Sequence, residues 1–309
     1  MSGRKFTLYW SSLELYEKCP QKFLWSKGWG VIDVGAGPGK RMPKPVKRSF
    51  HHALMGIVIQ AVIERLYNDE LWKEPKGLSD RLMKMVSREF TLELNKQFVD
   101  WRFSPAQSEL LQVCKDGVYG YLKTMKQHKL LGPYARCEID LVGFVNKYTP
   151  VGGRADFIIR TQNNEVLILD GKNSLSKGKY TDPDQLRWYA LLFYLAYGRM
   201  PDKLGFVYYR YPYGTPIEDS EDMESGVDWV DFSREDLKGL ANRAVEALKS
   251  IEREKFDPVP SPSNCRFCDY ETVCEARLAQ KKSRARKPKN VEDLLEGKDG
   301  IVELGLKGG

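Results

Sequence analysis

The chain has 309 residues, of which 42% are hydrophobic and 12% aromatic, enough for a folded core in one large domain or two ordinary ones. Lys and Arg number 49 against 42 Asp and Glu, a moderate basic excess that favours a polyanionic partner without requiring one. No run reaches the roughly 18 apolar residues of a membrane span, and the N-terminus lacks the apolar core of a secretory signal, so we expect a cytoplasmic protein without membrane contact.

The first 135 residues are predicted to be mostly helical. In "SSLELYEKCPQKFLW", Ser11 or Ser12 is a candidate N-cap, and a proline bends or ends the helix after Cys19. An exposed loop rich in Gly, Pro and basic residues is predicted over 34–49, and a long helix is predicted within 50–72. Further amphipathic helices are predicted within 78–101 and 105–128.

The sequence changes character near residue 136. Four segments enriched in β-branched and aromatic residues read as strands, "RCEIDLVGFV", "GRADFIIRT", "EVLILD" and "LGFVYYRYP". A helix is predicted between the third and the fourth, with Thr181 or Asp182 as N-cap and Gly198 as its stop. A second helix is predicted over 233–256. The order of elements predicts an α/β fold, in which helices flank a mixed sheet.

Two of these strands are predicted to form a hairpin. The Asn pair in "QNN", residues 162–164, suits a tight turn. With a three-residue loop the numbers of paired residues sum to 326, so Asp156 lies across from Asp170 on one face of the sheet. Lys172, two residues later, emerges on that face as well. An even-numbered loop without a bulge would place the two acids on opposite faces.

Two carboxylates held this close repel one another, which predicts a cation between them. Hard oxygen ligands suit Mg²⁺ or Mn²⁺, ions that bind through one or two carboxylates plus substrate phosphates. Lys172 would then orient or deprotonate a water, or stabilise negative charge on a phosphate. The alternative is a structural salt bridge at the end of a strand, which the D-x-K pattern by itself does not exclude.

The helix after the hairpin carries a second pattern. Gln185 and Tyr189 are spaced i, i+4, so they share one face of the helix. A Q-x-x-x-Y pair after a D-x-K hairpin resembles the RecB-like nucleases of the PD-(D/E)xK superfamily, which have a restriction-endonuclease-like core. The resemblance implies metal-dependent phosphodiester hydrolysis, with Asp156 and Asp170 as metal ligands, Lys172 as the lysine of the motif, and Gln185 with Tyr189 as the helix motif.

One position departs from this family pattern. The family usually has an upstream G-x-x-x-H helix whose histidine contributes to the metal site, and in "MGIVIQAVIERL" Gln60 stands at the histidine position. An amide is a weaker metal ligand than an imidazole. Three interpretations follow: Gln60 contributes to a looser metal site, His51 or His52 serves instead, or activity is reduced.

Six cysteines fall into two groups. Cys114 and Cys137 stand alone and are predicted to be small, partly buried residues. The C-terminal "CRFCDYETVC" supplies three thiols, one short of a tetrahedral Cys₄ site. The resemblance to the iron-sulfur subgroup of these nucleases, which includes the AddB subunit and the CRISPR-associated adaptation nuclease, implies a [4Fe-4S] cluster, with Zn²⁺ as the alternative. The four implied ligands are Cys19, Cys265, Cys268 and Cys274.

The expected substrate is DNA, as single strands or ends. Aromatic and basic residues interleave in "FLWSKGWG" and "YYRYPYG", a mode of contact that tolerates any sequence. Neither a recognition helix nor a Walker A loop is present, so we expect no sequence specificity and no built-in ATP motor. A helicase, integrase or other recombination partner is compatible with a role in DNA repair, recombination or CRISPR-type end processing.

The predicted organisation is one RecB-like nuclease domain over 1–280, followed by a basic, flexible tail over 281–309. The domain divides into a helical region to 135, an α/β catalytic core over 136–256 and a cysteine segment over 257–280. We expect a metal-dependent deoxyribonuclease, most simply an exonuclease. The alternative is a DNA-binding or assembly protein that retains the fold and the cluster with weak or no catalysis.

Overall fold

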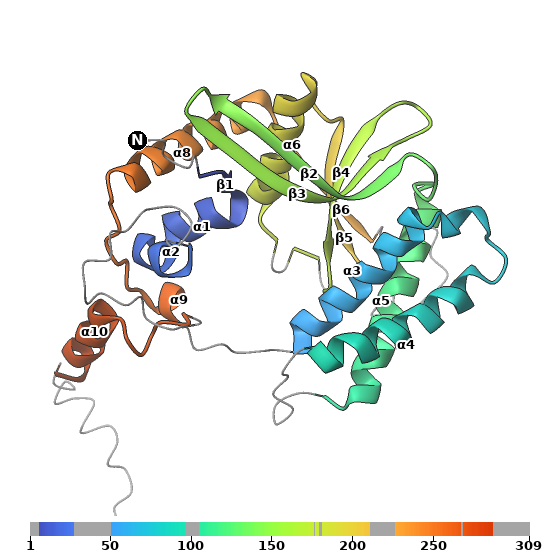
Figure 1. The fold of residues 1–309 in the computed structure, drawn as a ribbon, viewed down its shortest axis with the longest axis horizontal. Coiled ribbons are helices and arrows are strands. Elements are labelled where there is room, and N and C mark those ends of the chain that lie inside the picture. Colours follow the sequence, from blue (N-terminus) through green and yellow to red (C-terminus); the bar gives the residue numbers. More distant parts are fainter. Residues whose placement is uncertain are drawn as a thin grey trace, which may run out of the picture.

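The computed structural model describes residues 6–27, 51–96, 105–175, 177–178, 181–210, 226–266 and 268–286. These residues form a mixed sheet with helices on both faces, as Figure 1 shows, so the predicted α/β class is confirmed. The predicted loop over 34–49, and the predicted tail beyond Arg286, lie outside the described residues. None of the described helices is long and apolar enough to cross a membrane.

The sheet has six strands in the order β1-β3-β4-β5-β6, with β2 paired to the other edge of β3. β1 pairs with β3, and β4 with β5, in parallel, whereas β2–β3, β3–β4 and β5–β6 are antiparallel. The strands are β1 (Leu8–Tyr9), β2 (Ala135–Asn146), β3 (Thr149–Arg160), β4 (Val166–Lys172), β5 (Lys203–Tyr208) and β6 (Val227–Val230).

Helices cover both faces of this sheet and extend beyond its β1 end (Figure 1). The helices α1 to α5 lie between β1 and β2 in the sequence. Helix α6 (Pro183–Tyr197) connects β4 to the parallel strand β5. The helices are α1 (Trp10–Lys18), α2 (Pro20–Lys27), α3 (His51–Asn68), the 3₁₀ turn η2 (Leu71–Lys73), α4 (Leu78–Lys96), α5 (Gln107–Gln127), α6 (Pro183–Tyr197), α8 (Arg234–Glu252), α9 (Pro262–Cys265) and α10 (Glu275–Arg286).

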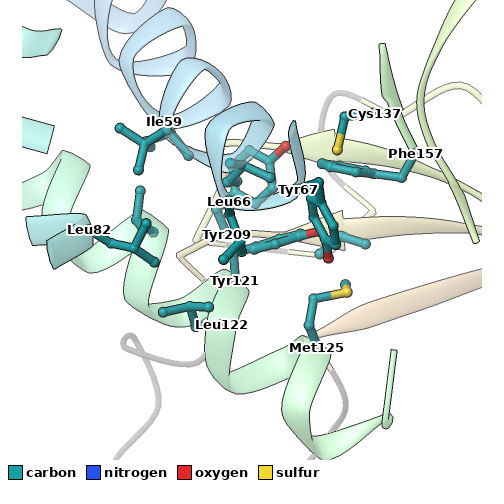
Figure 2. Close-up of a cluster of buried hydrophobic side chains, with 14 of the residues drawn as sticks. Ile59, Leu66, Tyr67, Leu82, Tyr121, Leu122, Met125, Cys137, Phe157 and Tyr209 are labelled. Carbon is teal, nitrogen blue, oxygen red and sulfur yellow. The ribbon is translucent and has the colours of Figure 1, made fainter. Parts of the chain in front are cut away.

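Two hydrophobic cores lie on opposite faces of the sheet. One core packs α3, α4 and α5 against the strands and contains the aromatic group of Tyr67, Tyr121, Phe157 and Tyr209 shown in Figure 2. The other core packs α1, α2, α6 and α8 against the sheet, with Trp188 fully buried at its centre. Because both faces of β4 are covered, its residues Val166–Leu169 form an unbroken apolar run instead of alternating with polar residues.

Local sequence signals set the bounds of the helices on the second face. Asp182 accepts a hydrogen bond from the backbone N–H of Asp184 at 3.0 Å, so it is the N-cap of α6, one of the two predicted candidates. Gly198 ends α6 at φ 71°, a left-handed conformation that favours glycine. α8 begins with a capping box between Ser233 and Asp236.

Two predicted element bounds were wrong. α1 begins at Trp10 with Tyr9 as its N-cap, so Ser11 and Ser12 lie inside the first turn, because β1 pairs with β3 up to Tyr9 and the chain enters the helix directly. α10 continues to Arg286, six residues into the predicted tail. Arg, Lys, Ala and Gln, which dominate this stretch, are good helix formers.

Candidate active site

The β3–β4 hairpin has the predicted register. The paired residues Phe157↔Leu169 and Arg160↔Val166 both have numbers that sum to 326. A three-residue loop, 162–164, joins the strands, and its last residue, Asn164, adopts φ 64°. A left-handed residue at the end of a three-residue hairpin loop is a common way to keep two strands paired. Continued by one residue from Phe157↔Leu169, this register places Asp156 across from Asp170.

Asp156 and Asp170 lie in one acidic group, in which Asp170 is buried and Asp156 partly buried. Asp170 is only 2% exposed, and a carboxylate oxygen of Asp156 accepts a hydrogen bond from the backbone N–H of Gly171 at 2.8 Å. Burial, reinforced by the charge of Asp170, raises the pKa of Asp156 to about 8, although the Gly171 N–H opposes this change. Burial also raises the pKa of Asp170, against the opposing effect of Lys172. In both acids burial thus disfavours the charged form, and a further cation beside them would favour it.

Lys172 and the helix α6 complete the group. The Nζ atom of Lys172 lies 2.6 Å from Oδ2 of Asp170 and donates to Oε1 of Gln185 at 3.0 Å. The Gln185 amide in turn donates to Oδ1 of Asp170 at 2.9 Å and to the Tyr189 hydroxyl at 3.4 Å. The structure thus brings together the five residues predicted from the D-x-K and Q-x-x-x-Y patterns, Asp156, Asp170, Lys172, Gln185 and Tyr189.

Two contacts fix α6 against the rest of the molecule. The indole N–H of Trp188 donates to the Gly152 carbonyl of β3 at 3.1 Å, which holds the helix face on the sheet. At the helix start, Arg243 of α8 contacts Asp184 at 2.5 Å and Glu17 of α1 at 2.7 Å. These contacts hold the first turns of α6, where Gln185 directly follows Asp184.

Glu138 is a third carboxylate that the sequence did not single out. The pairs Cys137↔Phe157 and Ile139↔Ala155 of the β2–β3 ladder place Glu138 across from Asp156. Three acids, Glu138, Asp156 and Asp170, therefore occupy neighbouring positions on three adjacent strands, and the charge of Glu138 contributes to the raised pKa values of the other two. Glu138 has φ 51°, an uncommon backbone conformation for a residue other than glycine that is enriched at functional sites.

Gln60 of α3 contacts this acidic row from the opposite side to α6. Its amide nitrogen donates to Glu138 at 2.7 Å, and its amide oxygen accepts from the Tyr209 hydroxyl at 2.9 Å. His51 and His52 lie at the start of α3, more than two turns before Gln60, with their rings 4.0 Å apart. Gln60 thus makes a direct side-chain hydrogen bond from this helix to the acids.

The side chains as they stand do not form a closed metal cage. Within the described ranges, no group of three or more His, Cys, Asp or Glu residues is arranged to hold a metal ion. Both oxygens of Asp170 face Lys172 and Gln185. The chemistry of the donors nevertheless suits a hard divalent ion, because carboxylates stand side by side in an arrangement that their own repulsion disfavours.

The four cysteines of the predicted cluster come from both ends of the chain to one place. Cys19, Cys265, Cys268 and Cys274 all line a cavity of about 20 Å³. The Asn264 amide donates to the Lys18 carbonyl at 2.8 Å, and the Tyr270 hydroxyl donates to the Trp25 carbonyl at 3.1 Å, so α1 and α2 are held to the C-terminal segment. Cys114 and Cys137, predicted to be partly buried, are both buried.

The sequence matches the family described as "PD-(D/E)XK nuclease superfamily" over residues 9–275. Seventeen chains of solved structures match as well. One of them, titled "Crystal structure of SSO0001", is 15% identical, with 86% of this chain and 96% of that chain covered at a TM-score of 0.32. A search of curated proteins finds no significant match. Since the family match spans most of its length, the chain belongs to the PD-(D/E)XK nuclease superfamily.

Proposed function

We propose that this protein is a RecB-like, metal-dependent deoxyribonuclease. The observation that supports this most strongly is the hydrogen-bonded group of Asp170, Lys172 and Gln185, built next to Asp156 by one hairpin and one helix. Buried carboxylates with raised pKa values and a lysine beside them are costly for stability, and such arrangements are typical of catalytic sites.

Asp156 and Asp170, with Glu138 beside them, would hold Mg²⁺ or Mn²⁺. When bound, such an ion polarises a phosphate oxygen and lowers the pKa of a water ligand. Lys172 would release Asp170 to the ion and place its ammonium group against the phosphate, where it stabilises negative charge or orients water. Gln185 would keep Lys172 in position, and Tyr189 would support Gln185.

The proposed substrate is DNA, as single strands or ends, without sequence specificity. The moderate basic excess of the chain and its aromatic content suit phosphate neutralisation and base stacking. Exonucleolytic processing in repair, recombination or CRISPR-type end capture fits this substrate, with a helicase or integrase as the kind of partner that would deliver it.

Digestion of end-labelled single-stranded DNA with Mg²⁺ or Mn²⁺ tests the proposal. Wild-type protein should shorten the strand, whereas Asp170→Ala and Lys172→Ala should lose activity and retain DNA binding. A circular single strand run in parallel separates the two modes, because an exonuclease leaves it intact. Cleavage by Asp170→Ala at the wild-type rate would refute the proposed site.

A second candidate function is DNA binding with weak or no catalysis. The observation in its favour is Gln60, an amide at the position where the resemblance implies a histidine ligand. In that case wild type and Asp170→Ala would bind single-stranded DNA equally well. Neither protein would cut it in the presence of Mg²⁺ or Mn²⁺.

We also propose that Cys19, Cys265, Cys268 and Cys274 hold a [4Fe-4S] cluster, with Zn²⁺ as the alternative. Their common cavity and the clasp between Asn264 and Lys18 support this grouping. A bound cluster would place four thiolates on iron and join the two ends of the chain. Anaerobically purified protein should then absorb in the blue region of the spectrum and contain iron, whereas zinc without this absorbance would favour the alternative.

A further inference from the structure

Gln60 has a chemically determined orientation. A carboxylate only accepts hydrogen bonds, so the amide group of Gln60 that faces Glu138, at 2.7 Å, must be its NH₂. The amide oxygen therefore faces Tyr209, whose hydroxyl donates to it at 2.9 Å. The oxygen, the part of an amide that binds a cation, is thus already engaged by a hydroxyl.

Tyr209 is itself rigidly held. Its side chain is buried beneath α3, in the core shown in Figure 2, with its ring 5.8 Å from that of Tyr121 in an edge-to-face contact. Its backbone N–H donates to the Lys172 carbonyl at 3.0 Å. The Tyr209 hydroxyl passes over Gly171, in space that a Cβ atom at that position would occupy. The glycine between Asp170 and Lys172 therefore makes room for the hydroxyl that orients Gln60.

Glu138 is the group on which this arrangement acts. Its backbone lies in the left-handed region, and its side chain is 26% exposed, so packing alone does not fix its carboxylate. One oxygen accepts from Gln60, and the other lies 3.8 Å from Nε of Arg154. Of these two contacts, the one with the Gln60 amide is close enough to hold the Glu138 carboxylate in place.

We propose that Gln60 is a positioning residue for Glu138 and not a metal ligand, with Tyr209 as its anchor. The inference rests on the proposed nuclease function and specifies the metal site, which would consist of carboxylate oxygens. An oxygen-only site suits Mg²⁺ and Mn²⁺, whereas imidazole would favour Zn²⁺ and later transition metals. Groups that orient metal ligands through hydrogen bonds commonly change metal affinity when they are lost.

Mn²⁺ binding, measured by electron paramagnetic resonance of the free ion, tests this without a cleavage assay. Gln60→Leu and Tyr209→Phe should each weaken Mn²⁺ binding about tenfold. The double variant should bind no more weakly than Gln60→Leu alone, because both changes act through one contact. Tyr67→Phe is the matched control: it removes another buried hydroxyl of the same core, bonded to Tyr121 at 2.7 Å, and should leave Mn²⁺ affinity unchanged.

The direction in which Tyr209→Phe changes the Mn²⁺ affinity distinguishes a positioning role of Gln60 from a role as metal ligand. If Gln60 bound the ion through its oxygen, removal of the competing hydroxyl would leave the affinity unchanged or raise it, and this result would overturn the inference. Equal losses in Tyr209→Phe and Tyr67→Phe would also overturn it, because they would indicate a general loss of packing. Asp170→Ala tests the proposed metal site independently of Gln60. Unchanged Mn²⁺ binding in that variant would refute the metal site itself, and with it the nuclease proposal.

Discussion

The protonation of Asp156 should control the stability of the protein in the absence of divalent ions. Its pKa is raised to about 8 by burial, from an ordinary value of 3.8. Between these values the folded state keeps a proton that the unfolded chain has lost, so the free energy of unfolding falls as the pH rises from about 4 to 8. The two pKa values lie about four pH units apart, which sets an upper limit of roughly 6 kcal/mol on this loss.

Asp156→Asn removes the titrating group while leaving an oxygen to accept from Gly171. We expect the variant to exceed wild type in free energy of unfolding at pH 8 by about 2 to 3 kcal/mol, roughly half of the limit, since water entry and local rearrangement relieve part of the cost. Its advantage should shrink by about 2 kcal/mol on going from pH 8 to pH 5.

Urea unfolding in buffer without divalent ions, followed by tryptophan fluorescence at both pH values, measures this difference. Added Mg²⁺ should then stabilise wild type at pH 8 more than Asp156→Asn, because the variant lacks one of the proposed carboxylate ligands. A variant that is no more stable than wild type at pH 8, or whose advantage is the same at pH 5, would refute the reasoning.

Two further substitutions test the supports of the site. Gly171→Ala should lower the free energy of unfolding by about 2 to 4 kcal/mol in urea titrations, because the methyl group overlaps the Tyr209 hydroxyl. The control is Gly56→Ala, where no atom lies within 4 Å of the added methyl group, and this variant should be more stable than wild type by about 0.5 to 1 kcal/mol. Arg243→Ala should cost only about 1 kcal/mol, since its contacts are partly exposed, yet it should reduce cleavage several-fold by loosening the start of α6. Wild-type turnover in Arg243→Ala would show that these ion pairs do not orient Gln185.

The core of the candidate site could be predicted because it depends on local rules. The Asn pair set the loop length, the alternation of side chains set the shared face of Asp156 and Asp170, and the helical repeat set Gln185 and Tyr189 on one side of α6. The structure agrees with each of these expectations.

Glu138 escaped prediction for a specific reason. The turn of the β2–β3 hairpin pairs Asn146 with Thr149, whereas the ladder from Phe144↔Pro150 onward is shifted by one residue. Without this irregularity Ile139, and not Glu138, would stand across from Asp156. Irregularities of this kind depend on packing over many residues, so the sequence could not place the third acid.

Contacts between residues far apart in the sequence could not be predicted either. Tyr209 and Gln60 are 149 residues apart in sequence, and nothing in the strand-like "LGFVYYRYP" distinguishes the tyrosine that reaches α3. Cysteine spacing could suggest a shared site but not its geometry, because the first thiol comes from the far end of the chain. The sequence therefore predicted which residues lie together better than it predicted the distant contacts that support them.

The ion pairs of Arg243 have a consequence for the relation between the two ends of the molecule. Glu17 lies two residues before Cys19, and Asp184 lies directly before Gln185, so one guanidinium links the thiol region to the acidic region. A change that displaces α1, such as oxidation of Cys19, would remove Glu17 from Arg243 and leave the start of α6 with one support fewer. A loss of the proposed nuclease activity in an aged sample would then indicate oxidation of a cysteine, although every acidic residue of the site is chemically intact.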